Sequence, residues 1–282
     1  MGQGVVAGEE SSTARHNGST PGAAEPFILA ERLSKTYTSK RGNIEALRGI
    51  DLAIPRGQFV SLVGPSGCGK STLLRCIAGL EHASGGTLSL DGQIILQPPD
   101  KLGIVFQSDV LLDWRTVLDN VLLPVEFHDL PRQQWIVRAR KLLDIIGLAG
   151  FVNRYPWELS GGMRQRVAIC RALIEDPNIL LMDEPFAALD AFTRDDLNLE
   201  LQKMWIQSPK TVVFVTHNIA EAVFLGDRVV VMARNPGRVA AVLDVDLPRP
   251  RPLAVRDTPA FSAYTARIRE VFEGLGEIRD SA

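Results

Sequence analysis

The chain has 282 residues, of which 45% are hydrophobic and 23% are charged, a composition typical of a folded globular protein. Its length suits one large α/β domain with an appendage, or two modest domains. A formal net charge of −2 argues against nucleic-acid binding through bulk electrostatic attraction. No apolar run reaches the ~18 residues needed to span a bilayer, so any role at a membrane would depend on a partner.

The cysteine spacing and the N-terminal composition both indicate a cytosolic protein. Cys68, Cys76 and Cys170 have neither metal nor redox spacing, and we expect them to be buried in a reducing compartment. Residues 1–26 are rich in Gly, Ala, Ser, Thr and Glu and lack the hydrophobic stretch of a signal peptide. We expect this segment to be a disordered tail.

From residue 27 onward the pattern predicts short strands. Strands are expected at 27–33 and 47–54, joined by a polar loop at 38–43. Tyr37 follows the first strand, where its ring is available for stacking. A third apolar run at Gln58–Val63 leads directly into a glycine-rich loop.

That loop matches G-x-x-x-x-G-K-[ST] between the third strand and a helix expected at Leu73–Ala78. Its residues are Gly64, Pro65, Ser66, Gly67, Cys68, Gly69, Lys70, Ser71 and Thr72. Such a loop points backbone N–H groups at phosphate oxygens, with the lysine near the β- and γ-phosphates and the serine hydroxyl on Mg²⁺. An accidental match is expected in on the order of one chain in a hundred. A nucleotide site is therefore the better interpretation.

A helical insertion into the α/β core is predicted after the strand at Ile104–Phe106. The strand ends at Gln107, whose neutral side chain could orient water or ligate Mg²⁺. From there to about residue 165 the chain reads as mostly helical, with helices expected at Val117–Val125 and Gln133–Ile146. Pro131 lies just ahead of the second of these helices, as an N-terminal signal.

A second glycine loop, Ser160-Gly161-Gly162, precedes a helix expected at Met163–Glu175. Its hydroxyl and N–H groups predict a second anion site at a helix N-terminus. The alternative is an ordinary serine N-cap, which would be favoured for this loop alone. Because the first loop already holds phosphate, two such sites suggest that a second subunit faces the first.

Polar side chains end two apolar strands of the predicted sheet. The run Ile179–Met182 ends in Asp183 and Glu184, which could bind Mg²⁺ and reach the water that attacks the γ-phosphate. A solvated carboxylate pair is the alternative. The strand at Thr211–Val215 leads to His217, on the sheet edge where α/β proteins bind ligands. Contact with the γ-phosphate is favoured there over a structural histidine.

The remaining elements predict a mainly parallel sheet covered by helices on both faces. A helix is expected at Thr193–Gln207, and further strands at 228–232 and 239–246. A proline-rich link at 247–252 leads to a terminal helix near Ala260–Phe272. We expect the apolar stripe of that helix to pack on the body of the chain, a dimer contact being the less favoured alternative.

In this order the motifs resemble those of the ATP-binding subunits of ABC transporters, from about Phe27 to Met232. They correspond to the Walker A loop at 64–72, the Q-loop at Gln107, the signature at 159–163, the Walker B strand at 179–184, the D-loop at 188–190 and the switch His217. Met163 replaces the commoner glutamine of the signature. No loss of phosphate contact is expected, because backbone N–H groups supply it.

The resemblance implies an ATPase that uses ATP and Mg²⁺ and works as a homodimer. It implies that Tyr37 stacks on adenine and that the second loop contacts the γ-phosphate of ATP held by the other subunit, while Asp190 couples the two sites. Lys70, Gln107, Glu184 and His217 would be catalytic, and Ser71, Gln107 and Asp183 would hold the metal.

The implied fold is a P-loop NTPase core with a mainly parallel sheet, an N-terminal antiparallel β subdomain and an inserted helical subdomain at about 108–165. The ATPase domain would span 27–246, followed by a C-terminal linker and helix at 247–282.

Within the family, three stretches resemble those of the subunits that import nitrate, sulfonate or taurine: Leu111–Asn120, Ala188–Arg194 and Asn235–Arg238. This implies a peripheral protein on the cytoplasmic face of the inner membrane. One partner would be a membrane permease, which would contact the surface around Asp109–Val117, with Trp114 near the contact. An extracytoplasmic solute-binding protein would be an indirect partner. No nucleic acid is expected as a partner.

Two other interpretations remain. A non-transport ABC ATPase acting on DNA would carry a long heptad insertion and a basic face, and neither is evident. A P-loop kinase or a regulatory module would leave Ser160–Gly162 and His217 unexplained. Cys68 lies within the phosphate loop near a helix N-terminus, where a thiolate is favoured. We expect alkylation of Cys68 to block ATP binding and ATP to protect the residue.

Overall fold

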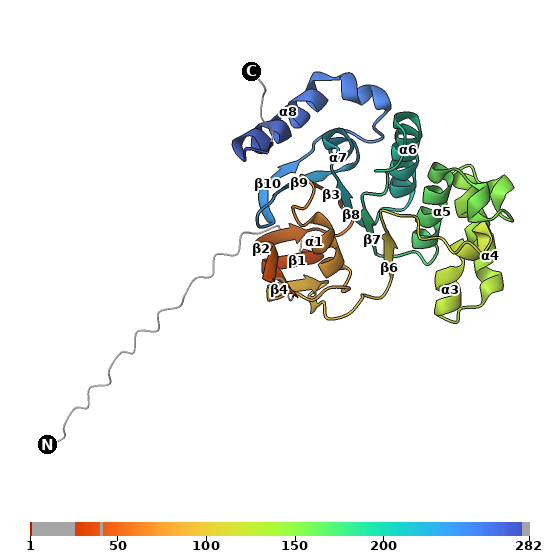
Figure 1. Ribbon diagram of the computed structural model, residues 1–282, viewed down its shortest axis with the longest axis horizontal. Helices are drawn as coiled ribbons and strands as arrows, with labels where there is room; N and C mark the ends of the chain where they lie inside the picture. Colours follow the sequence, from red (N-terminus) through yellow and green to blue (C-terminus); the bar gives the residue numbers. More distant parts are fainter. Residues whose placement is uncertain (2–25, 40–41, 278–282) are drawn as a thin grey trace.

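The computed structural model describes residue 1 and residues 26–39 and 42–277, and Figure 1 shows their arrangement. Except for its two end residues, the predicted tail at 1–26 lies outside these described residues. The strands are β1 (Ile28–Ser39), β2 (Gly42–Ile54), β3 (Phe59–Val63), β4 (Gly85–Leu90), β5 (Gln93–Ile94), β6 (Leu102–Val105), β7 (Ile179–Asp183), β8 (Thr211–Thr216), β9 (Arg228–Ala233) and β10 (Arg238–Asp244). The helices are α1 (Lys70–Ile77), α2 (Val117–Val121), α3 (Leu123–Phe127), α4 (Arg132–Ile145), α5 (Gly161–Leu173), α6 (Ala191–Gln207), α7 (Ile219–Leu225) and α8 (Pro259–Gly274), with 3₁₀ turns at Ala149–Phe151, Pro156–Glu158 and Leu253–Asp257.

A six-stranded sheet in the order β10-β9-β3-β8-β7-β6 forms the centre of the molecule. Every pairing in it is parallel except that of β10 with β9, so the predicted mainly parallel sheet is confirmed. All residues of β3, β7 and β8 are buried, because helices or a second sheet cover both faces. One face packs on α5 to α8, and the other packs on α1 and the N-terminal sheet. The carboxyl ends of β3, β7 and β8 therefore meet at one edge.

The N-terminal antiparallel sheet has the order β2-β1-β4-β5 and extends further than predicted. The expected polar loop at 38–43 is wrong, because β1 continues to Ser39 and β2 begins at Gly42. Tyr37 consequently lies within β1, paired with Ile44 across the hairpin. The outer part of this hairpin is largely exposed, so backbone pairing holds it without the apolar alternation that would have revealed it in the sequence.

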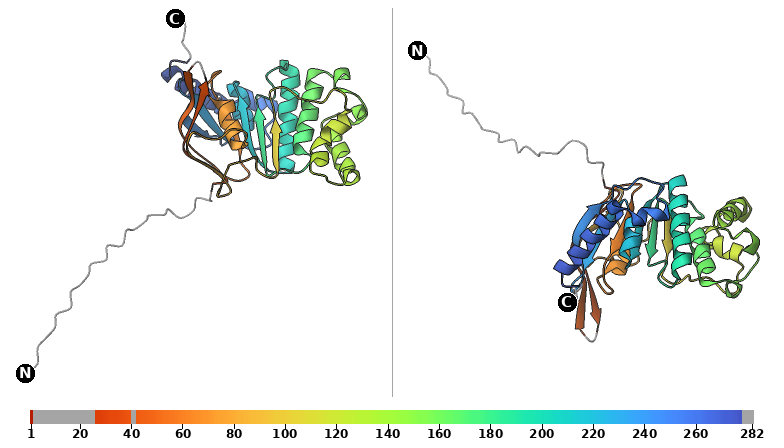
Figure 2. Two further views of the ribbon diagram at one scale, coloured as in Figure 1. Left: turned by 60° about the horizontal axis from the view of Figure 1, so that its bottom comes forward. Right: turned by 90° about the horizontal axis from the view of Figure 1, so that it is seen from above.

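The inserted helices α2 to α4 lie beyond β6 at one end of the molecule, beside α5 (Figures 1 and 2). They pack with α5 around a hydrophobic cluster of their own that includes Val121, Leu143 and Val167. The single helix predicted at Val117–Val125 is in fact two, which meet at Leu122. Pro124 is in the first turn of α3, where its missing N–H is tolerated. None of the helices in the described parts of the chain has the length and apolarity to cross a bilayer.

The C-terminal segment is fastened to the core by a buried arginine. Arg251 is 1% exposed, and its guanidinium donates to the carbonyl oxygens of Val223, Phe224 and Gly226 at 2.8–2.9 Å. The side-chain amide of Gln202 completes the junction by pairing with the Arg251 backbone. The predicted packing of the α8 stripe is confirmed, since its apolar side chains join the cluster that covers one face of the sheet.

Candidate active site

Other parts of the chain pack closely against the loop between β3 and α1. Gly67 and Gly69 have φ angles of +79° and +90°, which favour glycine. A Cβ atom at Gly69 would lie 2.8 Å from the Ala46 carbonyl oxygen, and one at Gly64 would lie 2.6 Å from that of Met232. Helix α1 begins at Lys70 without a side-chain cap. Its first N–H groups are therefore free to bind an anion.

Lys70 lies inside this loop with 4% of its surface exposed. Its Nζ donates to the carbonyl oxygens of Gly64 at 2.8 Å and Pro65 at 3.1 Å. The same nitrogen lies 3.5 Å from Oε1 of Glu184. The ammonium group is thus held at the centre of the loop, opposite the carboxyl end of β7.

The two predicted carboxylates occupy different environments. Asp183 is buried at the end of β7, where its Oδ1 accepts a hydrogen bond from Ser71 Oγ at 2.7 Å. Burial raises the pKa of Asp183, and the neighbouring charge of Glu184 adds to this effect, while the bond from Ser71 opposes it. Glu184 has a φ of +45°, an uncommon conformation for a non-glycine residue. That backbone turn directs its side chain over the phosphate loop.

Glu184 also faces the predicted histidine. Its Oε2 lies 3.1 Å from Nδ1 of His217, which follows β8. The carboxylate is therefore held between an ammonium group and an imidazole at the edge of the sheet. The structure thus brings together Lys70, Glu184 and His217, which the sequence assigns to the nucleotide site.

A cavity of about 390 Å³ lies over the loop and includes part of the predicted site. Ser66, Gly67, Gly69, Lys70, Ser71, Thr72, Gln107 and Glu184 all line it. Gln107 reaches this position because it follows β6, which is parallel to and adjacent to β7. Of the other predicted residues, Tyr37, Ser160–Gly162 and Asp190 lie outside the described lining of this cavity.

The second glycine loop and the segment around Asp190 come together elsewhere on the chain. Ser160 is the N-cap of α5 and accepts a hydrogen bond from Met163 N at 3.3 Å, so the N-cap alternative holds for its hydroxyl. Asp190 caps α6 in the same way through Thr193 N, and this bond lowers the pKa of the Asp190 carboxyl. A Cβ at Gly162 would lie 2.5 Å from Thr193 Cγ2, so the two helix starts pack closely.

Comparison with known proteins places this geometry in a family. The family model described as "ABC transporter" matches residues 47–187, half of the chain. The chain is 44% identical to the taurine import ATP-binding protein TauB of Rhizobium johnstonii, over 91% of this chain and 100% of the relative. It is 41% identical to the aliphatic sulfonates import ATP-binding protein SsuB of Bacillus cereus, over 90% and 99%.

Solved structures agree with the sequence matches. The dimeric structure of the bacterial ABC transporter cassette MJ0796 superposes with a TM-score of 0.70 at 36% identity, covering 78% of this chain and 99% of that one. A dimeric post-hydrolysis state of the same cassette, bound to ADP and phosphate, gives 0.67 at 34% identity with the same coverage. The chain belongs to the ABC transporter family. It is an ATPase subunit that binds ATP, and its fold is that of the ABC cassettes.

Sequence reasoning missed a buried network beside His217 of this ABC subunit. Glu221 accepts a hydrogen bond from Thr216 Oγ1 at 2.6 Å, and Thr216 Oγ1 in turn accepts one from Asn218 N at 3.0 Å. Arg194 Nε lies 3.3 Å from Glu221 Oε1, an ion pair without hydrogen-bond alignment. Both neighbours of His217 are thereby fixed. Asn218 with Glu221 three residues later is a helix-start signal. This signal could have indicated that Asn218 and Glu221 lie together at the start of a helix.

The turn between β9 and β10 was also missed as part of the nucleotide site. Asn235, Pro236 and Gly237 line the cavity over the loop, and Gly237 N donates to the Ala46 carbonyl at 3.2 Å. A side chain at Gly237 would overlap the Cys68 carbonyl. In the sequence this stretch shows only a resemblance to importers. Nothing local in it indicates contact with a loop some 170 residues away.

The expectation of a reactive Cys68 is wrong. The side chain is fully buried, and burial raises the pKa of its thiol more than the charge of Lys70 lowers it. The thiol points into the molecule, because the loop turns back over it. The broader expectation that all three cysteines are buried is confirmed.

Proposed function

We propose that this subunit powers the import of a small solute (nitrate, a sulfonate, taurine or a related compound) through a separate membrane permease. The names of the taurine and sulfonate relatives, at 44% and 41% identity over nine-tenths of the chain, support this class of solute. In this arrangement the subunit is peripheral on the cytoplasmic face of the inner membrane. A solute-binding protein on the outer side would act through the permease.

The position of Glu184 carries the proposed mechanism. Its carboxylate projects over the phosphate loop from a strained backbone, between Lys70 at 3.5 Å and His217 at 3.1 Å. A carboxylate in that place can accept a proton from, or orient, a water molecule attacking the γ-phosphate in line. Lys70 stabilises charge on the transferred phosphoryl group, and His217 holds the carboxylate and contacts the γ-phosphate.

The oxygen atoms around Ser71 suit Mg²⁺. Ser71 Oγ and the Asp183 carboxylate lie 2.7 Å apart at the cavity edge, and Gln107 adds an amide oxygen. Mg²⁺ prefers such hard ligands and is usually held by one or two protein groups plus substrate phosphates. That preference fits the absence of any cluster of three His, Cys, Asp or Glu side chains from the described residues. When bound, the ion neutralises charge on the β- and γ-phosphates.

We also propose that two copies close head-to-tail around two ATP molecules. The dimeric cassette structures support the assembly, and the placement of Ser160–Gly162 outside the cavity of its own chain fits contact with ATP on the other copy. Asp190, next to that loop through Thr193, would couple the two sites. Tyr37 would stack on adenine from the exposed hairpin.

The permease contact is proposed for the inserted helices beside Gln107. A groove of about 420 Å³ there is lined by Val110, Leu112 and Phe127 among others. Phe127 is 77% exposed, and Trp114 nearby along the chain is 74% exposed, so apolar surface remains open to a partner. Replacing Trp114 by Ala should weaken co-purification with the permease.

Glu184→Gln tests the function most directly. The variant should bind ATP as tightly as the wild type but lose multiple turnover, because the amide cannot accept the proton. Unchanged steady-state hydrolysis would refute the assignment. In the reconstituted complex, stimulation of ATPase activity by one candidate solute but not by others would identify the solute.

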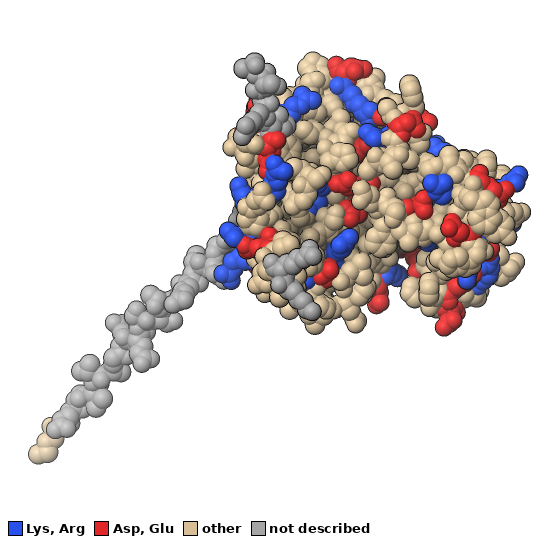
Figure 3. Space-filling view, viewed as in Figure 1, with Lys and Arg blue, Asp and Glu red and all other residues tan. Residues whose placement is uncertain are grey.

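The DNA-acting alternative receives no support from the relatives or from the one face of the molecule that Figure 3 shows. Lys and Arg are interspersed with Asp and Glu over the face shown in Figure 3, without a field of one sign. A pull-down with the full chain should recover a multi-span membrane protein, and recovery of DNA alone would favour the alternative. We propose residues 27–246 as the ATPase domain, with the insertion at about 108–165 and a C-terminal linker and helix at 247–282.

A further inference from the structure

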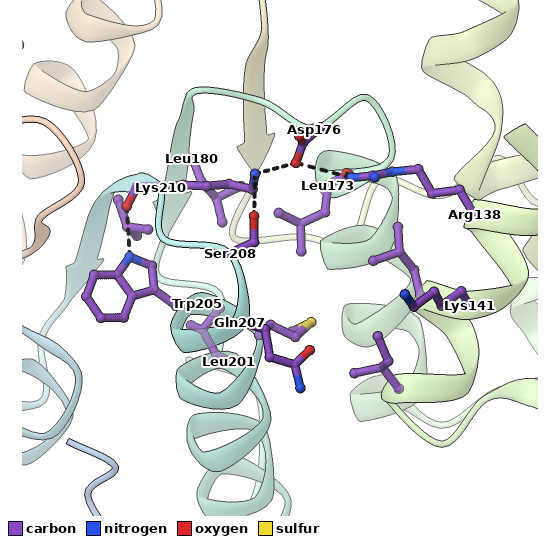
Figure 4. A pocket seen from close by; sticks show the side chains of 14 residues that line it. Arg138, Lys141, Leu173, Asp176, Leu180, Leu201, Trp205, Gln207, Ser208 and Lys210 are labelled. Carbon is purple, nitrogen blue, oxygen red and sulfur yellow. Dashed lines mark hydrogen bonds and ion pairs between the residues drawn. The ribbon is translucent and has the colours of Figure 1, made fainter.

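A second cavity, of about 290 Å³, lies between the inserted helix α4 and the core helix α6 (Figure 4). Its floor consists of Leu173, Leu180 and Leu201, all of which are at least nine-tenths buried. Ile145 and Met204 line it from the two facing helices. The volume is near the lower end of the ~300–1,000 Å³ typical of small-molecule sites. The cavity can therefore hold a small molecule with an apolar portion.

Three cations and one carboxylate line the opening of this cavity. Asp176 accepts hydrogen bonds from Lys210 and, at 3.3 Å, from Arg138. The bond from Lys210 lowers the pKa of Asp176, so the carboxylate is ionised at neutral pH. Arg138 also donates to the carbonyl oxygens of Leu173 and Ile174 at the end of α5. Arg138 and Lys210 therefore already have partners.

Lys141 differs from these two cations. Neither a hydrogen bond nor an ion pair joins Lys141 to any residue within 26–39 or 42–277. Figure 4 shows its ammonium group extending from α4 toward Gln207 of α6. The Gln207 amide likewise has no hydrogen-bond partner among the residues that the structure describes. Lys141 and Gln207 are both exposed to solvent, so the opening presents an accessible ammonium group and an amide above an apolar floor.

We infer that this cavity binds a small organic anion with an unbranched apolar tail. The acidic head would pair with Lys141 and Gln207, and the tail would lie over the three leucines. An inorganic anion would make no use of the apolar lining, and a neutral molecule would form no ion pair with Lys141. The ligand would contact both the inserted helix α4 and the core helix α6, and so restrain their relative movement.

The site can be tested with the full chain and simple probes. Calorimetric titration with hexane-1-sulfonate and with hexanoate should give a Kd of about 1 mM for at least one of them, as suits ligands of this size. Lys141→Met should weaken that binding about tenfold. Gln207→Glu, which places a negative charge at the opening, should weaken it further. Lys203→Met, the same change at an exposed residue of α6 outside the cavity, should have no effect.

Thermal unfolding separates loss of binding from loss of folding. At tenfold excess over Kd the anion should raise the melting temperature of the wild type by about 2–4 °C and that of Lys141→Met hardly at all, while the two proteins melt alike without ligand. Saturating ATP should leave the Kd unchanged, because the cavity is separate from the nucleotide site.

Control ligands decide the chemical class. Hexan-1-ol or sulfate binding as tightly as the anions would overturn the proposal, as would binding that Lys141→Met and Gln207→Glu leave intact, or no binding of either anion. Tighter binding of the sulfonate would assign the site to sulfonates. Tighter binding of hexanoate would assign it to carboxylates.

Discussion

The two glycine loops that precede α1 and α5 look alike in sequence but differ in what surrounds them. The first is enclosed: side chains at Gly64 and Gly69 would collide with backbone from β9 and β2, and Lys70 is buried within it. The second is open at its first two residues, since Ser160 is exposed and a Cβ at Gly161 would meet nothing closer than 4.0 Å, and only Gly162 packs closely, against Thr193. An enclosed loop can bind a phosphate group by itself. An open one suits completion by another molecule, which is the arrangement that we propose.

Lys70→Ala, which alters the enclosed loop, should have the largest effect on ATP binding and hydrolysis. The variant removes the charge at the centre of the enclosed loop and leaves Glu184 without its ammonium neighbour. We expect ATP binding to become undetectable by equilibrium dialysis and hydrolysis to cease, while the fold is kept. ATP binding at wild-type affinity would mean that the loop backbone alone suffices.

Gly69→Ala and Gly161→Ala form a matched pair, because each adds one methyl group to one of the two loops. At Gly69 the added Cβ would lie 2.8 Å from the Ala46 carbonyl oxygen, and φ is left-handed. Gly69→Ala should therefore lower the free energy of unfolding by roughly 1–3 kcal/mol and weaken ATP binding. Gly161→Ala should leave the stability of the chain and the binding of ATP by its own phosphate loop unchanged, because the space around Gly161 is free and the ATP that we propose this loop contacts is held by the other copy. Urea unfolding and nucleotide titration of both variants measure the contrast. Equal loss of stability at the two positions would contradict it.

Glu221 connects the surroundings of the two loops within one chain. Gly162 packs on Thr193, the adjacent Arg194 pairs with Glu221, and Glu221 holds Thr216 beside His217. Glu221→Leu should lower stability by roughly 1–3 kcal/mol, because Thr216 loses a buried acceptor and Arg194 loses its ion-pair partner.

The Glu221→Leu variant should also lower kcat without raising KM for ATP, since it displaces His217 and not the nucleotide. Glu221→Gln keeps an acceptor for Thr216 without the charge, and it should recover most of kcat. Steady-state kinetics of both variants give the comparison. A change in KM alone would show that the network serves binding and not the switch.

The smallest effect is expected at Cys68. Its raised thiol pKa means that less thiolate is present at any given pH than for a free cysteine, so alkylation at pH 8 should be slow whether or not ATP is present. Mass spectrometry after iodoacetamide treatment checks this, with the urea-unfolded chain as a control in which all three cysteines react. Rapid modification that ATP prevents would restore the original expectation.

Local signals made the core of the site predictable. Fully buried strands such as Ile179–Asp183 read as apolar runs, and the polar residues that end them meet at one edge because parallel strands place their carboxyl ends together. Glu184, His217 and Gln107 were therefore found from sequence.

The features that were missed depend on contacts between distant segments or on solvent exposure. The Asn235–Gly237 turn packs on the phosphate loop, and the end of the β1–β2 hairpin is paired but exposed. At Cys68 two known effects oppose each other, and only the three-dimensional packing of the loop shows that burial raises the thiol pKa more than the charge of Lys70 lowers it. Pattern and spacing carry no information about such balances.

The buried guanidinium of Arg251 has a consequence for where the chain can be cut. Its nitrogens donate to four carbonyl oxygens that precede residue 247. Those of Val223 and Phe224 are in the last turn of α7, the helix that begins beside His217, and a third belongs to the C-cap Gly226. Truncation after residue 246 would leave these oxygens without their donor, and each buried oxygen left unpaired costs about 1–3 kcal/mol. It would also uncover the apolar surface beneath α8. We therefore expect a protein shortened in this way to fold poorly, although it keeps every family motif.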